Sequence, residues 1–188
     1  MNKIYEDITI VTVLYNSKKL AQSFFSNLEN FSIIVVDNGR NEKVIEKIKG
    51  YKNIKIISKN KNIGYGNAIN FAVKNVSTRF FLILNPDLKI DEKSIVNMYD
   101  ILNQYSDCAI VAPVTRFSKD FYGAFPERNI KNLTLKNALK SRDLLLNSEI
   151  ESEICVDVAK WALLIKAEEF ENIGGFNDWK ESGGPIES

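Results

Sequence analysis

The residues of this chain best suited to chemistry stand in short polar runs, each directly behind an apolar segment. Asp37 and Asp87 bring a carboxylate to two of these runs, and Asn85 stands near the second. Carboxylate and amide oxygens bind Mg²⁺ or Mn²⁺, and they accept hydrogen bonds from the N–H and O–H groups of a nucleotide. The runs are Tyr15 and Asn16; Asp37, Asn38 and Gly39; Lys59, Asn60, Asn62, Gly64 and Gly66; and Asn85, Pro86 and Asp87.

These runs have a second interpretation, because Asn, Asp, Gly and Pro are also the usual residues of turns. Taken singly, each run is more typical of a turn than of a ligand site, and Asn85-Pro86-Asp87 alone would be an ordinary turn leaving a strand. Taken together they favour a ligand crevice, because the carboxylates recur behind buried segments.

The chain contains no histidine, which limits the chemistry available to it. A Ser-His-Asp or Cys-His nucleophile and every histidine-containing zinc site are excluded. A bound metal must therefore be held by oxygen ligands, which favours Mg²⁺ or Mn²⁺, and a general base is expected to be a carboxylate.

Both common glycine-rich nucleotide loops are absent from the sequence. No GxGxxG follows the first apolar segment, and there is no GxxxxGK[ST]. The fragment Gly64-Tyr65-Gly66 is not diagnostic, but it would let the backbone approach an anion at the start of a helix. A nucleotide held without either loop needs a cation for its diphosphate, and Asp87 is the best placed ligand for it.

The elements that must position these residues alternate between strands and helices. Short β-branched or aromatic runs predict strands, and apolar residues at helical spacing predict helices. This alternation predicts an α/β domain with a mostly parallel sheet and helices on both faces, whose ligands bind outside the carboxyl ends of the strands. The expected strands are Ile8–Leu14, Ile33–Val36, Ile54–Ile57, Phe80–Leu84 and Ala109–Ala112; the expected helices contain Leu20–Leu28, Val44–Ile48, Ala68–Val76 and, capped by Asp91 or Ser94, Ile95–Leu102.

The second half of the chain is less regular. Asn129–Asn147 is expected to be helical, Ile154–Ile165 to form a strand, and Ala167–Asn172 a short helix ended by Gly174 and Gly175. We expect one domain over residues 1–188, with a donor-binding part at about 1–112, a partial acceptor part at about 113–177 and an atypical tail at 178–188.

The bulk composition predicts a soluble protein of ordinary type. A net charge of +1, from 25 basic and 24 acidic residues, gives no case for nucleic acid. Cys108 and Cys155 are expected to be buried free thiols, which fits a reducing cytoplasm. No signal peptide and no apolar run of bilayer length is recognised. The basic stretch Asn129–Asn147 is expected to pack on the sheet; the alternative is a peripheral contact with the inner face of the plasma membrane, which would suit a lipid-linked acceptor.

Five segments, in order, resemble family 2 glycosyltransferases, and the resemblance runs from about Ile8 to about Asn177. Within that family the chain looks most similar to the rhamnosyltransferase-like branch, which builds bacterial surface polysaccharides. The segments are VTVLYNS (Val11–Ser17), IIVVDNG (Ile33–Gly39), NKNIGYGNAINFA (Asn60–Ala72), FFLILNPD (Phe80–Asp87) and IKAEEFENIGGF (Ile165–Phe176).

The resemblance implies a nucleotide-diphospho-sugar transferase fold (GT-A, Rossmann-like) and an inverting mechanism. It implies that Asp37 hydrogen-bonds the base or ribose, and that the NPD triplet replaces the family's DxD motif, so that Asp87 carries Mg²⁺ or Mn²⁺ against the diphosphate. The implied donor is a dTDP- or UDP-sugar, and the acceptor a saccharide or lipid-linked saccharide of O-antigen or capsule synthesis. The implied donor-binding residues are Tyr15, Asn16, Asp37, Asn38, Asn62, Gly64, Asn67, Asn85 and Asp87.

The chain departs from the family pattern in two places. Lys160 and Trp161 stand where the family usually has a small Gly-Ala pair; the Trp could stack on a sugar ring, but core packing is the simpler explanation. After Phe176 the family normally continues to an acidic pair that supplies the base. Here Asp178 and Glu181 are candidate bases only because they are carboxylates nearby in the sequence, and their spacing does not match the family's. We hypothesise a frameshift, insertion or truncation after Asn177.

Three functions remain open on the sequence. The first is an active inverting glycosyltransferase, and the second is a remnant that binds the donor but has lost its base. The third is a different nucleotide-sugar enzyme such as a nucleotidyltransferase. That class would need a glycine-rich loop after the first strand, which VTVLYNSKKL does not provide, so it ranks last.

Overall fold

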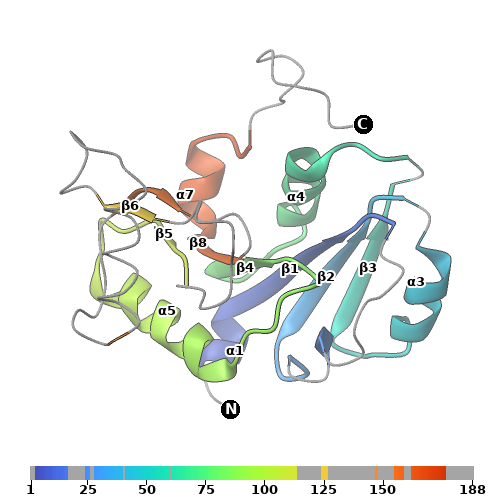
Figure 1. The fold of residues 1–188 in the computed structure, drawn as a ribbon, viewed down its shortest axis with the longest axis horizontal. Coiled ribbons are helices and arrows are strands. Elements are labelled where there is room, and N and C mark those ends of the chain that lie inside the picture. Colours follow the sequence, from blue (N-terminus) through green and yellow to red (C-terminus); the bar gives the residue numbers. More distant parts are fainter. Residues whose placement is uncertain are drawn as a thin grey trace.

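The computed structural model describes residues 3–16, 24–25, 28–39, 41–59, 61–113, 124–126, 147, 155–158 and 162–176. Within these ranges it contains a six-stranded sheet, a two-stranded sheet and flanking helices (Figure 1). In chain order the elements are α1 (Lys3–Asp7), β1 (Ile8–Leu14), β2 (Ser32–Asp37), α3 (Glu42–Ile48), β3 (Ile54–Ser58), α4 (Tyr65–Val73), β4 (Phe80–Leu84), α5 (Glu92–Gln104), β5 (Ile110–Val111), β6 (Ala124–Pro126), β7 (Cys155–Val158), β8 (Ala162–Lys166) and α7 (Ala167–Asn172).

The six-stranded sheet has the order β3-β2-β1-β4-β8-β5. The first four of these strands are parallel to one another, with Leu14 paired to Asp37 and Asp37 to Ser58 at their carboxyl ends. Strands β1 and β4 are buried along their whole length, as their unbroken apolar sequences predict for a parallel sheet covered on both faces.

Strand β8 is the exception, because it runs antiparallel to both of its neighbours. It pairs Ala162 with Leu84 and Lys166 with Phe80 on the β4 side, and Leu164 with Val111 on the β5 side. The amino end of β8 therefore lies at the same edge of the sheet as the carboxyl ends of β1 to β4.

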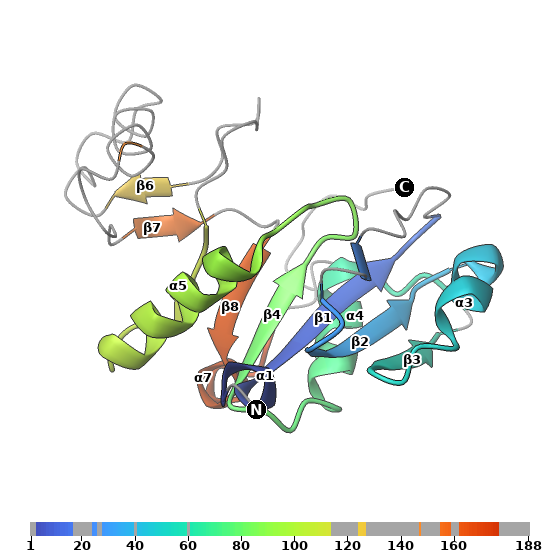
Figure 2. The same cartoon turned by 90° about the horizontal axis from the view of Figure 1, so that it is seen from below.

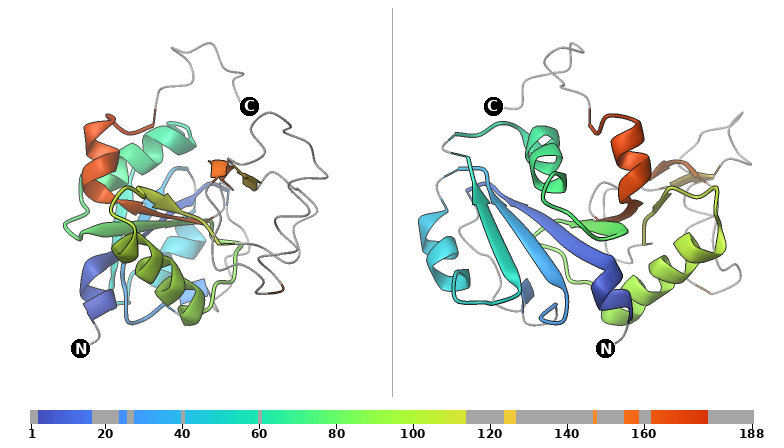
Figure 3. Two further views of the ribbon diagram at one scale, coloured as in Figure 1. Left: turned by 90° about the vertical axis from the view of Figure 1, so that its left-hand side faces the viewer. Right: turned by 180° about the vertical axis from the view of Figure 1, so that it is seen from behind.

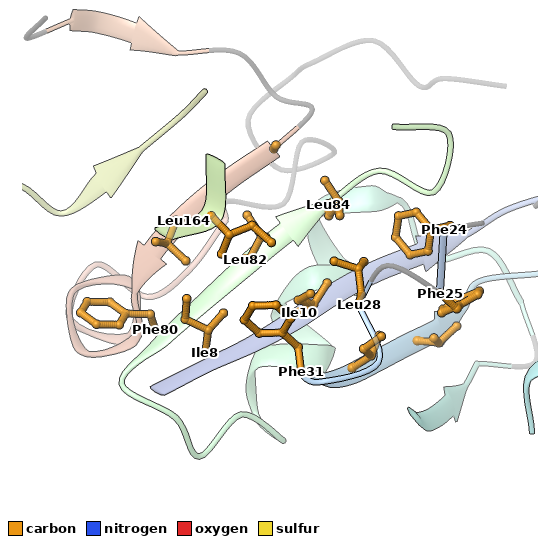
Figure 4. Close-up of a cluster of buried hydrophobic side chains, with 14 of the residues drawn as sticks. Ile8, Ile10, Phe24, Phe25, Leu28, Phe31, Phe80, Leu82, Leu84 and Leu164 are labelled. Atoms are coloured by element: carbon orange, nitrogen blue, oxygen red, sulfur yellow. The ribbon is translucent and has the colours of Figure 1, made fainter. Parts of the chain in front are cut away.

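Helices cover both faces of the sheet. Helices α4 and α7 lie on one face, and α1 and α5 lie on the other (Figures 1 and 3); the view from below shows α1 and α5 in front of the strands (Figure 2). Each face has its own apolar cluster. The α5 face contains Ile8, Ile10 and Leu164 with Phe80 (Figure 4), and the α4 face contains Val11, Ile69 and Phe81.

Most of the elements expected from the sequence are present. All five strands expected in the first 112 residues are confirmed, although β5 is only two residues long. Asp91, rather than Ser94, is the N-cap of α5, and its side chain accepts a hydrogen bond from Ser94 N at 2.7 Å. Of the helix expected over Leu20–Leu28, Phe24 and Phe25 are described as helical and both are buried.

The expectation of a single strand over Ile154–Ile165 is wrong. Strand β7 pairs with β6 in the small sheet, whereas β8 belongs to the large one. Cys108 is a free thiol but only half-buried, and its Sγ lies 3.4 Å from the Ile110 carbonyl oxygen. The helix expected over residues 129–147 falls outside the described residues except for Asn147, as do Lys160 and Trp161. No helix within the described ranges is long and apolar enough to cross a membrane.

Candidate functional site

The candidate residues gather at the edge of the sheet where β1 to β4 end. The parallel register brings these four carboxyl ends together, and each is followed by one of the polar runs. This edge is where an open parallel sheet binds its ligands. The juxtaposition expected from the sequence is therefore present for the described residues.

The carboxylate of Asp37 is held in a fixed orientation at the end of β2. Its Oδ1 accepts hydrogen bonds from Asn41 Nδ2 at 2.6 Å and from Gly39 N at 3.2 Å. Ser58 Oγ, at the end of β3, lies 3.5 Å from the other oxygen. Asp37 is half-buried, so Oδ2 retains acceptor capacity for a ligand at little reorganisation cost.

Asn38 and Asn62 join the end of β2 to the loop that precedes α4. Asn38 Nδ2 donates to Asn62 Oδ1 at 2.9 Å and to the Gly64 carbonyl at 3.3 Å, while Asn38 Oδ1 accepts from Ile63 N at 3.0 Å. Asn62 Oδ1 also accepts from Gly64 N at 2.9 Å. Asn38 is only 2% exposed, whereas Asn62 and Gly64 are exposed.

Helix α4 begins at this loop and points its amino end at the same edge. Gly64 is its N-cap residue, with φ 81° and ψ 161°, and no side chain caps the helix. This backbone conformation is readily available only to glycine. The uncapped N–H groups of the first turn, which contains the half-buried Asn67, favour an anion.

Asn85 and Asp87 follow β4, next to the start of α4. The hydroxyl of Tyr65 donates to Asn85 Oδ1 at 2.9 Å and so links the first residue of α4 to the NPD triplet. The pKa of Tyr65 is raised to about 12, first because desolvation of its hydroxyl group by the surrounding protein disfavours the phenolate and second because Asp87 is negatively charged. Tyr65 therefore stays a hydrogen-bond donor at neutral pH.

Tyr15 and Asn16 follow β1 and are both exposed, Tyr15 at 51%. A Cβ at Gly39 would lie 3.4 Å from the Tyr15 ring, so glycine lets the turn after β2 approach this ring closely. Asn16 has a φ of 47°, in the left-handed region that asparagine tolerates better than most residues. The exposed ring of Tyr15 is suited to stacking on a planar base.

The described residues could hold the metal implied by the sequence through one protein carboxylate, not through a cluster of several protein ligands. No group of three or more His, Cys, Asp or Glu side chains lies within metal-binding reach among the residues that the structure describes. Mg²⁺ is commonly held by one or two carboxylates, with substrate phosphates and water completing its shell. The exposed Asp87 beside the uncapped start of α4 fits that arrangement.

The turn after α7 is attached to α4 by a pair of hydrogen bonds. Asn70 Nδ2 donates to the Phe176 carbonyl at 2.8 Å, and Phe176 N donates to Asn70 Oδ1 at 2.9 Å. Phe176 also stacks edge-on against Phe170, with ring centroids 5.2 Å apart. The candidate bases Asp178 and Glu181 follow this turn but lie outside the described residues.

Sequence reasoning missed three residues of this edge. Asn41 holds Asp37, Ser58 approaches it, and Tyr65 holds Asn85. Ser58 directly follows the expected third strand, Ile54–Ile57, and Tyr65 stands between Gly64 and Gly66, so the sequence pattern could have indicated both positions. Asn41 gave no such signal, because it follows the expected polar run. Its contacts with Asp37 and the Gly39 carbonyl lie within the turn after β2, and its contact with the Leu14 carbonyl reaches β1.

A mostly parallel sheet with one antiparallel strand, helices on both faces and polar loops at its carboxyl edge defines a GT-A domain, the fold of nucleotide-diphospho-sugar transferases. The chain belongs to glycosyl transferase family 2, whose model matches residues 9–161. The resemblance noted in the sequence motifs is thereby confirmed at the level of the family.

Two curated proteins are similar to this chain over part of their length. The teichoic acid poly(glycerol phosphate) polymerase of Staphylococcus epidermidis is 23% identical over 95% of this chain and 25% of its own length. The low-salt glycan biosynthesis hexosyltransferase Agl10 of Haloferax volcanii is 26% identical over 57% of this chain and 36% of its own length. The chain thus spans between a quarter and about a third of these relatives.

Solved structures support the fold. The mannosyltransferase PcManGT from Pyrobaculum calidifontis, in complex with GDP-Man and Mn²⁺, superposes with a TM-score of 0.63 at 14% identity, over 91% of this chain and 47% of that one. TarS 1-349 from S. aureus, in complex with UDP-GlcNAc, gives 0.57 at 14% identity, over 89% and 47%. The chain covers about half of each.

Proposed function

We propose that this chain binds a nucleoside-diphosphate sugar at the carboxyl edge of its sheet and transfers the sugar to an acceptor hydroxyl with inversion at the anomeric carbon. The observation that carries the proposal is the convergence of the oriented Asp37 carboxylate, the uncapped start of α4 and Asp87. Family membership supports the reaction class, and the complexes of PcManGT with GDP-Man and of TarS with UDP-GlcNAc support the donor class.

In this proposal each part of the donor meets a different strand end. Tyr15 stacks on the base with Asn16 beside it, and Asp37 accepts hydrogen bonds from the base or ribose. The first turn of α4, with Gly64 and Asn67, receives the diphosphate, and Asn62 holds the preceding loop. Asn85 and Asp87 lie on the phosphate side.

A divalent cation, Mg²⁺ or Mn²⁺, would be held by Asp87 and would offset the negative charge that builds on the departing diphosphate. The Mn²⁺ named with PcManGT supports this assignment. A carboxylate near the acceptor would take the proton of the attacking hydroxyl, and Asp178 and Glu181 remain the candidates on this chain.

We further propose that the product is a cell-surface glycan, with rhamnose as one candidate sugar among others. The two curated relatives, a teichoic acid poly(glycerol phosphate) polymerase and a glycan biosynthesis hexosyltransferase, support this context. The free thiol of Cys108 fits a reducing compartment, so we place the reaction in the cytoplasm, with a lipid-linked acceptor at the inner membrane face as one possibility.

The test is the unfolding free energy of the chain with UDP, dTDP or GDP, each with and without Mn²⁺ or Mg²⁺. A nucleotide at about a hundred times its dissociation constant should add about 2.7 kcal/mol to the unfolding free energy. We expect this gain with one nucleotide, only with the metal, and not in Asp87→Ala. Asp100→Ala is the matched control, because it removes an exposed acid on α5, away from the edge.

Transfer from the matching nucleotide sugar is then followed by mass spectrometry, and the anomeric configuration of the product by NMR. Binding without transfer would favour a donor-binding remnant over an active enzyme. A folded wild-type chain that gains no stability with any of the three nucleotides would contradict the donor site itself.

A further inference from the structure

Among the described residues of the carboxyl edge, Asn38 is the most deeply buried polar residue, and both hydrogens of its side-chain amide are used inside the protein. It is 2% exposed, and its backbone N–H donates to the Leu14 carbonyl at 2.9 Å, which fixes it between the ends of β1 and β2. Its amide group donates to Asn62 and Gly64 and accepts from Ile63. The amide nitrogen has two hydrogens and both have acceptors, so no donor remains for a ligand.

The loop that Asn38 contacts has few other attachments to the sheet. Among the described residues, Asn62 and Gly64 are otherwise joined only to each other and, through Ala68 N, to the first turn of α4. Gly64 also has the widest backbone freedom of any residue type, so its conformation is costly to order. The side chain of Ile63 packs against the apolar cluster on the α4 face. The three hydrogen bonds of Asn38 are therefore the main polar restraint on residues 62–64 from the end of β2.

These contacts lie at the point where the proposed diphosphate meets α4. The first N–H groups of a helix bind an anion, and they bind it more tightly when the loop before them is already ordered, because less conformational entropy is lost on binding. Asn38 makes these contacts from the end of β2, directly beside Asp37. It therefore connects Asp37, which is proposed to bind the base or ribose, with the start of α4, which is proposed to bind the diphosphate.

We propose that Asn38 is a positioning residue for the donor: without touching it, Asn38 holds residues 62–64 in the conformation that lets the start of α4 receive the diphosphate. This inference rests on the proposed function and assigns Asn38 a different role from Asp37, Asn62 and Asp87. A loop that is competent only part of the time lowers apparent affinity by that fraction.

The first variant is Asn38→Ala, assayed by calorimetry with UDP, dTDP and GDP, each with Mn²⁺. Three lost hydrogen bonds should raise the dissociation constant of the nucleotide that binds the wild type by about tenfold or more. In transfer assays KM for the donor should rise by a similar factor while kcat changes by less than about threefold. The Ile63 and Gly64 amides should exchange with solvent faster than in the wild type, and the β1 amides should not.

The matched control is Asn53→Ala. Asn53 is half-buried, less deeply than Asn38, and like Asn38 it holds a loop, because its Nδ2 donates to the Phe31 carbonyl at 3.0 Å. It precedes β3 at the opposite edge of the sheet. This variant should lose stability and leave the nucleotide dissociation constant within about twofold of the wild type, because the sites are independent.

The second variant, Asn38→Asp, separates positioning from a general loss of stability. Its carboxylate still accepts from Ile63 N but opposes the oxygens of Asn62 and Gly64, whereas the protonated acid can donate to one of them. Burial raises the pKa of such a carboxyl group. Lowering the pH from about 7.5 to about 5.5 should therefore improve nucleotide affinity in Asn38→Asp relative to the wild type, with no such gain in Asn38→Ala.

The outcomes are distinct. If Asn38→Ala binds the nucleotide with the same dissociation constant as the wild type, the inference is overturned and the proposed function stands. The same holds if Asn53→Ala loses as much nucleotide affinity as Asn38→Ala. A wild-type chain that binds none of the three nucleotides overturns the proposed function and this inference with it.

Discussion

The hydroxyl of Tyr65 connects α4 to the NPD triplet through its hydrogen bond to Asn85. Tyr65→Phe deletes the hydrogen bond to Asn85 and leaves the ring in place, so the unfolding free energy should fall by about 0.5–1.5 kcal/mol. Denaturant unfolding measures this change. Tyr105→Phe is the control, because Tyr105 is similarly exposed, at 43% against 42%, and its hydroxyl makes no hydrogen bond to the described residues. An equal loss in both variants would contradict the assignment.

Tyr65 should also lose its proton at a higher pH than an ordinary tyrosine. Its pKa is about 12 in the folded chain against 10.0 in the unfolded chain, so the folded state keeps the proton that the unfolded state loses. The stabilising contribution is complete below pH 10 and disappears as the pH rises toward 12. The ultraviolet absorbance titration of the wild type minus that of Tyr65→Phe isolates this residue, and a midpoint near 10 would contradict the prediction.

The sequence predicts which residues belong to the site where those residues directly follow an expected strand. Asp37, Asn62 and Asp87 follow apolar runs, and parallel pairing brings such ends together. The different roles of Asp37 and Asn38 were not predictable, because both are polar residues that directly follow the same apolar run in the sequence. Only the structure separates a buried amide used by the protein from a half-buried carboxylate that faces outward.

At the level of elements, the docking of the turn after α7 onto α4 can be tested with two neighbouring glycines. Gly174 and Gly175 have φ values of 80° and 81°, so alanine is strained equally at both. A Cβ on Gly174 meets nothing within 4 Å, whereas one on Gly175 would lie 2.6 Å from Asn70 Oδ1. Gly174→Ala should cost about 1–2 kcal/mol, and Gly175→Ala about 1–3 kcal/mol more, through the displaced Asn70.

Thermal and denaturant unfolding of the two variants provide the comparison. The added cost at Gly175 should decrease when Asn70 is changed to Ala, because the nearest obstructing atom is then removed and only the Phe170 ring, at 3.3 Å, remains in the way. Equal costs at Gly174 and Gly175 in the wild-type background would show that Asn70 does not pack against this turn.

The strands of the first half were predictable because each is a short apolar run bounded by turn residues. The split between β7 and β8 was not, since both lie within one apolar stretch and join different sheets. The antiparallel position of β8 between β4 and β5 was hidden for the same reason: local sequence specifies a strand, but its neighbours are chosen by long-range packing.

For the molecule as a whole, one buried hydroxyl limits stability. Thr12 lies in the centre of β1 at 0% exposure, and its Oγ1 has no hydrogen-bond partner in the part of the chain that the structure describes. Thr12→Val removes this cost and should raise the unfolding free energy by about 1 kcal/mol. Thr9→Val on the same strand should give no gain, because Thr9 Oγ1 accepts a hydrogen bond from the Thr78 hydroxyl at 2.9 Å. Denaturant unfolding of both variants decides the matter; a loss in Thr12→Val would mean that the hydroxyl is satisfied.

The antiparallel direction of β8 also bears on how such chains diverge. In the part of the chain that the structure describes, the polypeptide leaves the large sheet after Val111 and re-enters it at Ala162, on the neighbouring strand and at the same edge. These two points therefore lie side by side. The entropy of closing a loop between fixed ends grows only with the logarithm of its length. Insertions, deletions or replacement of this segment during evolution should therefore change the free energy of unfolding only slightly through loop-closure entropy. Descendants can inherit the edge that carries Asp37 and Asp87 unchanged while the sequence between these two anchor points drifts.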